Sequence, residues 1–339
     1  MSIAASYGET NPGKKRRRNE DAFVCSPPLF AVADGMGGAQ AGEVASSLAA
    51  SSVSDGLGSF DHVAPADAEK VVAGLIRDAN RLVHQRATDD AAASGMGTTM
   101  TVALAAGDHA VTIGHVGDSR AYLLRDGSLE QLTDDHSLVA ELVRRGELSP
   151  TEAEVHPQRS VITRALGTDP DVEVDVFTIE ARGGDVFLLC SDGLSTMVDA
   201  DAIAQILERN RGQLPTATRE LIRAANDSGG DDNITAVLFQ ISDDGDTETV
   251  IAAEPVAQSA DEEDTLHPED AVPAIEMPAA EPPGADGDTT VLSAAAVAAA
   301  VAAEPAPQPL PVVRLLFATL VIIGLAGLIV LLAIWGLAR

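Results

Sequence analysis

The sequence predicts an α+β fold in which antiparallel sheets are covered by helices, and two observations support this prediction. Short apolar runs rich in β-branched residues indicate buried strands, and two of them, 100–105 and 111–116, are joined by a Gly-Asp turn typical of an antiparallel pair. Helical patterns occur in pairs between sets of strands, whereas a parallel βαβ repeat would alternate single helices with single strands.

Five segments have the apolar spacing of amphipathic helices. The clearest is 66–88, where apolar residues recur every three or four positions along most of its length. The predicted helices are 42–57, 66–88, 137–148, 201–210 and 215–227. The other expected strands, each bounded by turn residues, are 29–33, 186–191 and 234–241.

Negative charge is concentrated in the C-terminal part of the 339 residues, whose formal net charge is −30. Residues 244–313 contain 15 Asp and Glu and no Lys or Arg. Without them, and without the arginines at 314 and 339, residues 1–243 keep 37 of the 52 acidic and 20 of the 22 basic residues, a net charge of −17. Nucleic-acid binders usually present a basic surface, so this body is not expected to bind nucleic acid.

Composition divides the chain into a body at 1–243, a linker at 244–311 and a C-terminal segment at 312–339. The linker is rich in Ala, Pro, Asp and Glu and has no aromatic residue. It is expected to be disordered, because it cannot bury enough apolar area to offset its ordering entropy. Residues 315–338 are 24 uncharged residues, and about 20 suffice to cross a bilayer. A buried core helix is the alternative, but such a helix would not follow an acidic linker.

A single-pass membrane protein with its body in the cytoplasm is the expected topology. The basic run at 14–18 is not followed by the apolar stretch of a signal peptide, and two cysteines in 339 residues fit a reducing compartment. Arg314 and Arg339 flank the apolar segment, so flanking charge hardly discriminates between orientations. Residues 312–339 are therefore expected to anchor the body to the cell membrane from the cytoplasmic side.

Four aspartates mark the ends of apolar strands. Asp34, Asp118 and Asp192 each end one run, and Asp232 begins another. If these strands share one core, the four carboxylates can gather at one rim, where like charges raise each other's pKa. A divalent cation relieves that repulsion, and ligation by oxygen alone favours Mg²⁺ or Mn²⁺ over zinc. The pattern predicts an enzyme of metal-dependent phosphoryl chemistry.

Two further motifs lie near these strand ends. The glycines of Asp-Gly-Met-Gly-Gly at 34–38 permit a tight turn, and the Gly35 carbonyl is the candidate to approach a cation, although structural turns use the same residues. The basic run at 16–18 precedes Asn-Glu-Asp at 19–21. Composition alone leaves open whether this run belongs to a site or to a solvated face.

The ordered combination of these motifs resembles the metal-dependent protein serine/threonine phosphatases, the type 2C or PPM family, and specifically their bacterial branch. The resemblance covers residues 6–241 and includes Gly-Met-Gly-Thr-Thr at 95–99 and the stretch 156–166. It implies a four-layer α/β/β/α sandwich, in which two antiparallel sheets are flanked by helix pairs. It also implies that residues 136–168 form the flap, a variable insertion beside the active site.

The resemblance also implies roles for individual residues. Arg16 falls at the phosphate-binding position, where its guanidinium can hold a phosphate bidentately. The implied ligands of two catalytic Mn²⁺ or Mg²⁺ ions are Asp34, Gly35, Asp192 and Asp232, and those of a third ion are Asp118 and Ser160. The residues implied to surround these ligands and hold water on the ions are Glu20, Asp21 and Asn233.

The implied activity is hydrolysis of phosphoserine and phosphothreonine in proteins by a metal-activated water, opposing bacterial Ser/Thr kinases. No cysteine or serine nucleophile is needed, so Cys190 beside Ser191 is expected in the core. Some eukaryotic relatives have a histidine after the Asp-Gly as a proposed general acid. Here Met36 stands at that position, and a thioether cannot donate a proton. His136 is a candidate substitute, although a structural role near a helix start is the simpler interpretation.

Two other functions are open on the sequence. A catalytically weak phosphoprotein-binding module could keep the fold, but a pure binder has no need of the mutually repelling Asp34, Asp192 and Asp232. A metal-dependent nuclease is disfavoured by the acidic body. The expected partners are phosphorylated proteins, among them Ser/Thr kinases and their substrates, and the membrane.

Overall fold

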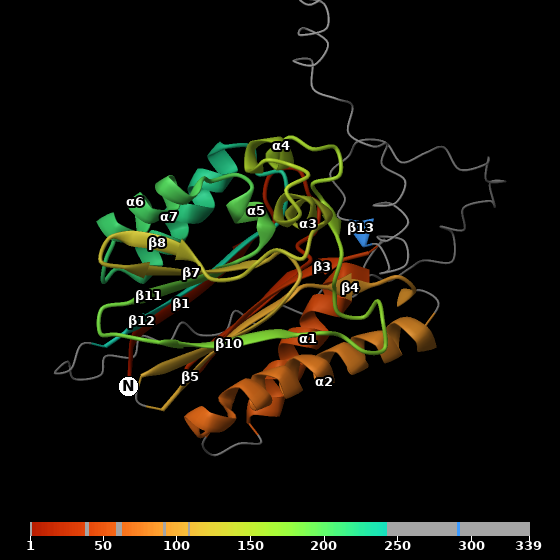
Figure 1. Ribbon diagram of the computed structural model, residues 1–339, viewed down its shortest axis with the longest axis horizontal. Helices are drawn as coiled ribbons and strands as arrows, with labels where there is room; N and C mark the ends of the chain where they lie inside the picture. The colour runs from red at the N-terminus through yellow and green to blue at the C-terminus, as the bar shows by residue number, and fades with distance from the viewer. Residues whose placement is uncertain are drawn as a thin grey trace, which may run out of the picture. The chain divides into compact units, whose positions relative to one another are not determined.

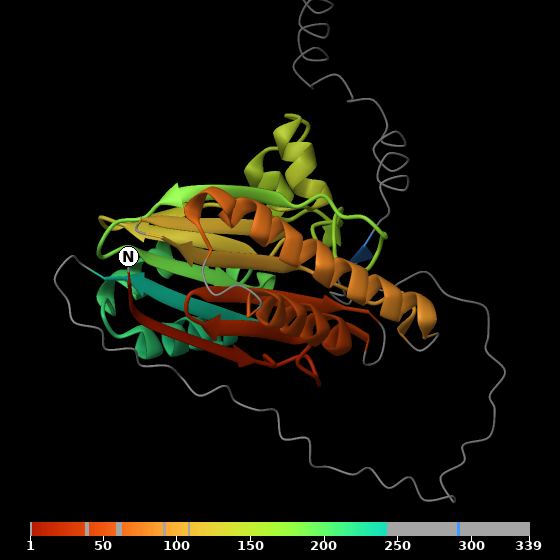
Figure 2. The same ribbon diagram turned by 90° about the horizontal axis from the view of Figure 1, so that it is seen from below.

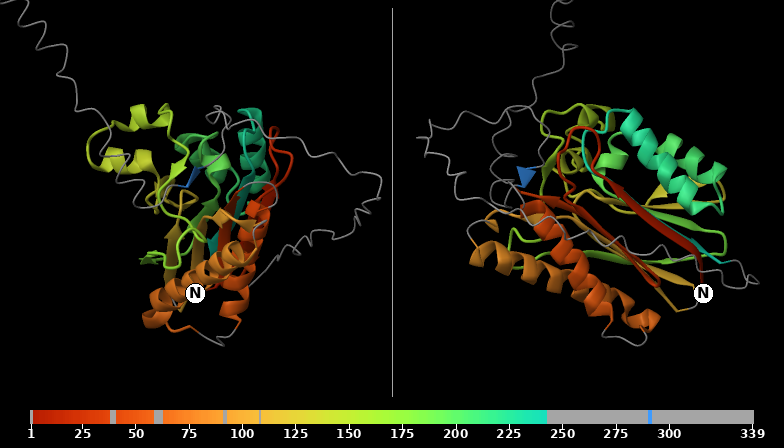
Figure 3. Two further views of the ribbon diagram at one scale, coloured as in Figure 1. Left: turned by 90° about the vertical axis from the view of Figure 1, so that its right-hand side faces the viewer. Right: turned by 180° about the vertical axis from the view of Figure 1, so that it is seen from behind.

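The computed structural model describes residues 2–37, 41–58, 63–90, 93–107, 109–242 and 290–291. Within the body they form two antiparallel sheets with a pair of helices on the outer face of each (Figures 1 and 3). The expected α+β class, with two helix-flanked antiparallel sheets, is confirmed. The predicted anchor and all of the predicted linker except 290–291 lie outside the described residues. No helix in the described ranges is both long and apolar enough to cross a bilayer.

The first sheet has five strands in the order β1-β12-β11-β7-β8, all antiparallel. They are β1 (Ile3–Asn11), β12 (Ile234–Ile241), β11 (Val186–Cys190), β7 (Arg120–Arg125) and β8 (Ser128–Gln131). The first strand therefore pairs with the last strand of the body, and Thr10 lies opposite Thr235.

The second sheet has the order β10-β6-β5-β3-β2, with the short β4 added to β3. Its strands are β10 (Asp175–Glu180), β6 (Ala110–Val116), β5 (Met100–Ala106), β3 (Leu29–Met36), β2 (Asp21–Ser26) and β4 (Gly97–Thr98). The predicted antiparallel pairing of 100–105 with 111–116 is confirmed, since Met100 lies opposite Val116 and Ala106 opposite Ala110.

Strands at the centre of both sheets are buried on both faces, which explains why the sequence shows continuous apolar runs. In β3, Phe30 faces the other sheet and Ala31 faces the helices. The ring of Phe239 stacks on that of Phe30 from the other sheet, with centroids 4.1 Å apart, and on that of Phe187 in the neighbouring strand of its own sheet, with centroids 4.8 Å apart. The contact between Phe30 and Phe239 therefore joins the two sheets.

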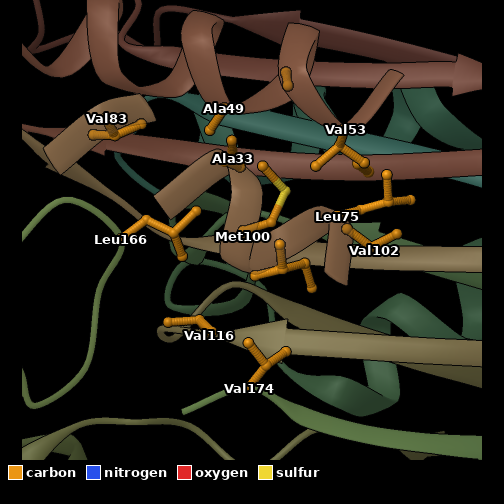
Figure 4. Close-up of a cluster of buried hydrophobic side chains, with 14 of the residues drawn as sticks. Ala33, Ala49, Val53, Leu75, Val83, Met100, Val102, Val116, Leu166 and Val174 are labelled. Atoms are coloured by element: carbon orange, nitrogen blue, oxygen red, sulfur yellow. The ribbon is translucent and has the colours of Figure 1, made fainter. Parts of the chain in front are cut away.

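The helices pack in pairs on the outer faces. Helices α1 (Ala41–Leu57) and α2 (Ala68–Asp89) cover the second sheet, where their side chains form one apolar cluster with its strands (Figure 4). Helices α6 (Ala200–Arg209) and α7 (Leu214–Asp227) cover the first sheet. All four predicted helices at these positions are confirmed, with residues 65–67 forming a 3₁₀ turn before α2.

The predicted helix 137–148 is shorter in the structure. Helix α3 (Leu138–Arg144) is followed by Gly146, whose φ of +73° reverses the chain. A second flap helix, α4 (Pro150–Glu154), begins with a capping box between Ser149 and Glu152, and the flap helices project from the body (Figure 2). Strand β9 (Val161–Ile162) follows and pairs in parallel with β13 (Thr290–Val291).

Close packing of α2 on the second sheet depends on a glycine. A Cβ at Gly114 of β6 would overlap Val72 and lie 2.7 Å from Ile76 Cδ1. We expect Gly114→Ala to destabilise the fold by about 1–3 kcal/mol, because the extra methyl overpacks this contact. Gly74→Ala is the control, because nothing lies within 4 Å of its Cβ position, and Ala should stabilise a helix interior by about 0.5–1 kcal/mol. Urea unfolding followed by circular dichroism measures both, and equal effects would contradict this packing argument.

Candidate metal and phosphate site

Five aspartates lie at the same end of the two sheets. Asp21 begins β2, Asp34 lies near the end of β3, Asp118 follows β6, Asp192 begins the short helix α5 (Asp192–Ser195) after β11, and Asp232 precedes β12. Antiparallel pairing brings the end of one strand to the start of its neighbour, and Asp21 lies directly opposite Asp34. The structure therefore brings together the four aspartates that mark the strand ends and Asp21, which the resemblance placed around them.

Burial and mutual repulsion shift the pKa values of these carboxyl groups upward. Burial first, and then the charges of Asp21 and Asp192, hold the pKa of Asp34 well above 3.8. Burial and the Asp232 carboxylate raise the pKa of Asp192 to about 6. The pKa of Asp118 is also well above its ordinary value, because of burial and the Asp192 carboxylate. Such a set remains ionised only beside compensating positive charge.

Asp21 is held by two hydroxyl groups from the first sheet. Ser191 Oγ and Thr235 Oγ1 donate hydrogen bonds of 2.8 and 2.6 Å to its Oδ2. Burial raises the pKa of Asp21 to about 7, although these two hydroxyls oppose the shift. The Oδ1 atoms of Asp21 and Asp192 are buried without a hydrogen-bond partner in the described structure. Two buried carboxylate oxygens without donors are the chemical signature of a cation site.

The Thr-Thr pair of the 95–99 motif fixes the backbone of Asp34. The Asp34 N–H donates to Thr99 Oγ1 at 2.9 Å, and Thr98 Oγ1 donates to the Asp34 carbonyl at 2.9 Å. Thr99 Oγ1 also lies 2.7 Å from Ser119 Oγ in the turn after Asp118. One threonine thus connects the strand ends that carry Asp34 and Asp118.

Gly35 stands at a point where the backbone has no room for a side chain. Its N–H donates to the Glu20 carbonyl at 3.1 Å, and a Cβ there would overlap the Gly42 carbonyl. A Cβ at Gly42 would in turn lie 2.7 Å from Glu20 Oε2. Both glycines are therefore required by close approach of chain segments.

His136 positions the turn that carries Asp118. Its Nδ1 accepts a 3.0 Å hydrogen bond from the Gly117 N–H, so the proton of the neutral ring lies on Nε2, 3.1 Å from Asp175 Oδ2. Arg164 Nη1 donates to the other oxygen of Asp175 at 2.6 Å. Burial, and then the Arg164 charge, lower the pKa of His136. Because both ring nitrogens are engaged, the structural interpretation of His136 is favoured over a general acid.

Arg16 is directed at the carboxylates. Its Nη2 donates a 2.8 Å hydrogen bond to Asp232 Oδ2, and the two side chains are 28 and 24% exposed. The Asp232 Oδ1 accepts from the Asn233 N–H at 2.8 Å. A guanidinium at the edge of this acidic set offers a positive charge on which a phosphate could dock beside the carboxylates.

The Asn233 side chain fixes the loop that carries Arg16. Its Oδ1 accepts from the Glu20 N–H at 2.7 Å. Its Nδ2 donates to the carbonyls of Pro12 and Arg18 at 3.1 and 2.9 Å. Both N–H donors and the oxygen of one amide are thereby used to close the loop between β1 and β2.

The candidate ligand atoms fit a hard divalent cation, because they are carboxylate oxygens and two of them are buried without a hydrogen-bond donor. In the described ranges, no three His, Cys, Asp or Glu side chains are already gathered as ligands of one ion. Ser160 lies directly before β9 in the flap and makes no hydrogen bond to the aspartates within the described residues. The metal-ligand roles of Asp34, Gly35, Asp118, Ser160, Asp192 and Asp232 remain predictions.

Several positioning residues were not identified from the sequence. Ser191 stands next to Asp192, and Thr99 lies inside a motif already noted, so both had a local signal. Thr235 and Asp175 had none, because each acts on a residue that is distant in sequence. Only the fold reveals these contacts.

The sequence of the body matches a family model and individual known proteins. A family model described as Protein phosphatase 2C matches residues 14–238. The serine/threonine phosphatase stp of Listeria welshimeri is 41% identical over 239 residues, which cover 68% of this chain and 93% of that protein.

Solved structures resemble the body closely. The crystal structure of the Mycobacterium tuberculosis serine/threonine phosphatase PstP/Ppp matches with a TM-score of 0.66 at 39% identity, covering 71% of this chain and 100% of that chain. A crystal structure of the PstP catalytic domain in complex with two manganese ions matches with a TM-score of 0.65 at 35% identity, covering 71% and 99% of the two chains.

Raised pKa values make the stability of the metal-free protein depend on pH. Between the ordinary pKa of 3.8 and about 7, folded Asp21 keeps a proton that the unfolded chain releases. The free energy of unfolding should therefore fall as pH rises through this window, and it should be highest near pH 4 as far as this group is concerned. Asp21→Asn should flatten the slope, because the amide never ionises yet keeps an oxygen for Ser191 and Thr235. Urea unfolding in EDTA measures the difference, and identical slopes in the two proteins would contradict this assignment.

Proposed function

This chain belongs to the protein phosphatase 2C family, and we propose on that premise that it hydrolyses phosphoserine and phosphothreonine in proteins with the help of divalent metal. It is a hydrolase of the protein serine/threonine phosphatase class. The observation that carries the proposed mechanism is the set of buried carboxylates, two with donorless oxygens, beside the Arg16 guanidinium.

Bound divalent ions would supply positive charge that lowers the pKa of an attacking water and neutralises the phosphate. The residues proposed to hold two Mn²⁺ or Mg²⁺ ions are Asp34, Asp192 and Asp232 with the Gly35 carbonyl, and those proposed for a third ion are Asp118 and Ser160. Glu20, Asp21 and Asn233 would surround them, with Asp21 oriented by the hydroxyls of Ser191 and Thr235.

Arg16 would hold the non-bridging phosphate oxygens, since its planar fork matches them and its Nη2 already lies beside Asp232. Attack on phosphorus in line with the ester oxygen breaks the P–O bond and releases the serine or threonine hydroxyl, which needs a proton. Met36 has no proton to give, and both ring nitrogens of His136 are engaged. We therefore propose that water in the site protonates the leaving oxygen.

A catalytically weak phosphoprotein-binding module on the same fold is the rival. Binding a phosphate requires Arg16 but not a set of buried acids whose burial and mutual repulsion oppose ionisation. The distinguishing experiment is Mn²⁺-dependent release of inorganic phosphate from a phosphothreonine peptide by the full chain. Tight peptide binding without release of phosphate would favour the rival.

We expect Asp34→Asn and Asp192→Asn each to lower Mn²⁺-dependent turnover by at least about 100-fold, because each removes a proposed ligand of the ions. Neither change should destabilise the metal-free fold, since each removes one of several mutually repelling charges. Phosphate release at saturating Mn²⁺ and circular dichroism measure the two effects.

Asp201→Asn, the same chemical change at an exposed position in α6, is the matched control and should retain wild-type turnover. Near-wild-type rates in both site variants would rule out the proposed ligand set.

We propose further that residues 312–339 anchor the chain in the cell membrane, with the phosphatase body in the cytoplasm near membrane-bound Ser/Thr kinases and their substrates. The 24 uncharged residues at 315–338 support this placement. Protease added to intact spheroplasts should spare the body and should degrade it only after lysis. Degradation of residues 1–243 in sealed spheroplasts would reverse the proposed orientation.

A further inference from the structure

The loop between β1 and β2 is a basic segment in an acidic body. It contains five consecutive basic residues, Lys14-Lys15-Arg16-Arg17-Arg18, in a body whose net charge is −17. We call residues 14–18 the basic loop. The mechanism above uses only Arg16 and leaves the other four cations without a role.

Hydrogen bonds hold the basic loop against the segment that carries Asp232. The N–H groups of Lys14 and Lys15 donate to the Gly230 carbonyl at 2.7 and 3.2 Å. The Asn233 side chain holds the Arg18 carbonyl at 2.9 Å. Backbone anchors at both ends keep the cations in a defined place beside Arg16, so a ligand would meet a preorganised surface.

Apart from Arg16, the cations of the basic loop are exposed, and Lys14 and Lys15 make only surface ion pairs. Lys14, Lys15, Arg17 and Arg18 are all exposed, and Arg17 has no ion-pair or hydrogen-bond partner among the described residues. Lys15 pairs with Asp231 at 2.8 Å, and Lys14 with Asp227 at 4.0 Å, both between exposed side chains. Exposed ion pairs contribute little to stability, so a bound anion could replace these partners at small cost.

We propose that the basic loop selects substrates in which acidic residues flank the phosphorylated serine or threonine. This specificity rests on the proposed phosphatase function and deepens it by naming the substrate class. When Arg16 holds the phosphate, the neighbouring cations lie along the peptide on either side of it. Extended peptides advance about 3.3 Å per residue, so acids one to three positions away fall within reach of Arg17 and Lys14.

Charge complementarity also predicts which peptides are disfavoured. The rest of the body is net negative, and a basic peptide would be drawn to that surface and repelled at the loop. Because the contacts are exposed, salt should weaken the preference, as it screens charges beyond roughly 10 Å at 0.1 M. Hydrolysis of a small phosphoester without flanking residues should not depend on Lys14 or Arg17, because it needs only the phosphate contact of Arg16.

The test compares two phosphothreonine peptides of equal length, one with Asp and Glu flanking the phosphoresidue and one with Asn and Gln in their place. The full chain with Mn²⁺ should show a lower KM for the acidic peptide, and the preference should decline with added salt. Arg17→Gln should raise the KM for the acidic peptide about two- to fivefold, the scale of one exposed ion pair, and should leave the neutral peptide unchanged. Lys14→Gln combined with Arg17→Gln should raise it further.

Arg77→Gln is the matched control, because it removes the same charge from an exposed position in α2 and should preserve the preference. Turnover of p-nitrophenyl phosphate reports the catalytic centre, including Arg16, independently of Lys14 and Arg17. Equal KM values for the two peptides, or a preference that survives Arg17→Gln and the double variant, would overturn the proposal while leaving the phosphatase function intact. Failure to hydrolyse any of the three substrates would instead refute the proposed function.

Discussion

Repulsion among five clustered carboxyl groups, most of them buried, is the constraint on which this structure depends. The strand ends place Asp21, Asp34, Asp118, Asp192 and Asp232 within mutual electrostatic range, and burial raises the pKa of most of them. A protein does not keep such a set for stability, since each buried charge must be compensated. Hydroxyl groups hold Asp21 and threonines hold the backbone of Asp34 without adding positive charge, and only Asp232 among these three pairs with a guanidinium. The remaining demand for positive charge is what a metal-dependent hydrolase uses.

Asn233 and its neighbours connect the segment that carries Asp232 to the loop that carries Arg16. Residues 230–233 carry Asp232, bind the backbone of the basic loop through the Gly230 carbonyl, and close that loop through the Asn233 amide. The proposed phosphate contact and the proposed metal ligand therefore cannot shift independently. This coupling explains why an asparagine directly follows the aspartate, because a side chain with both donor and acceptor groups is needed there.

The fold class and the position of four aspartates at the rim of the sheets were largely predictable, since both depend on local pattern. Strands buried on two faces leave continuous apolar runs, and an aspartate at the end of such a run marks a rim residue. Contacts between side chains that are distant in the sequence could not be predicted in the same way. Ser191 binds Asp21 across 170 positions, and Arg16 reaches Asp232 across 216. His136 shows the limit most clearly: its sequence context fits an acid or a helix start, and only the contacts with Gly117 and Asp175 decide between them.

Electrostatic repulsion and attraction also relate the acidic body to its basic loop. A net charge of −17 lowers the local concentration of phosphoprotein substrates, because these are anions. The five clustered cations of the basic loop place positive charge beside the carboxylates proposed to bind metal, where the substrate is proposed to enter. Exposed ion pairs with Asp227 and Asp231 hold Lys14 and Lys15 near the site, and a substrate can displace these weak pairs. Attraction at the site entrance and repulsion elsewhere favour phosphorylated segments over other anions only if the phosphate and its flanking acids bind together. Arg16 lies between basic neighbours in the chain, so the phosphate and the flanking acids can bind at the same time.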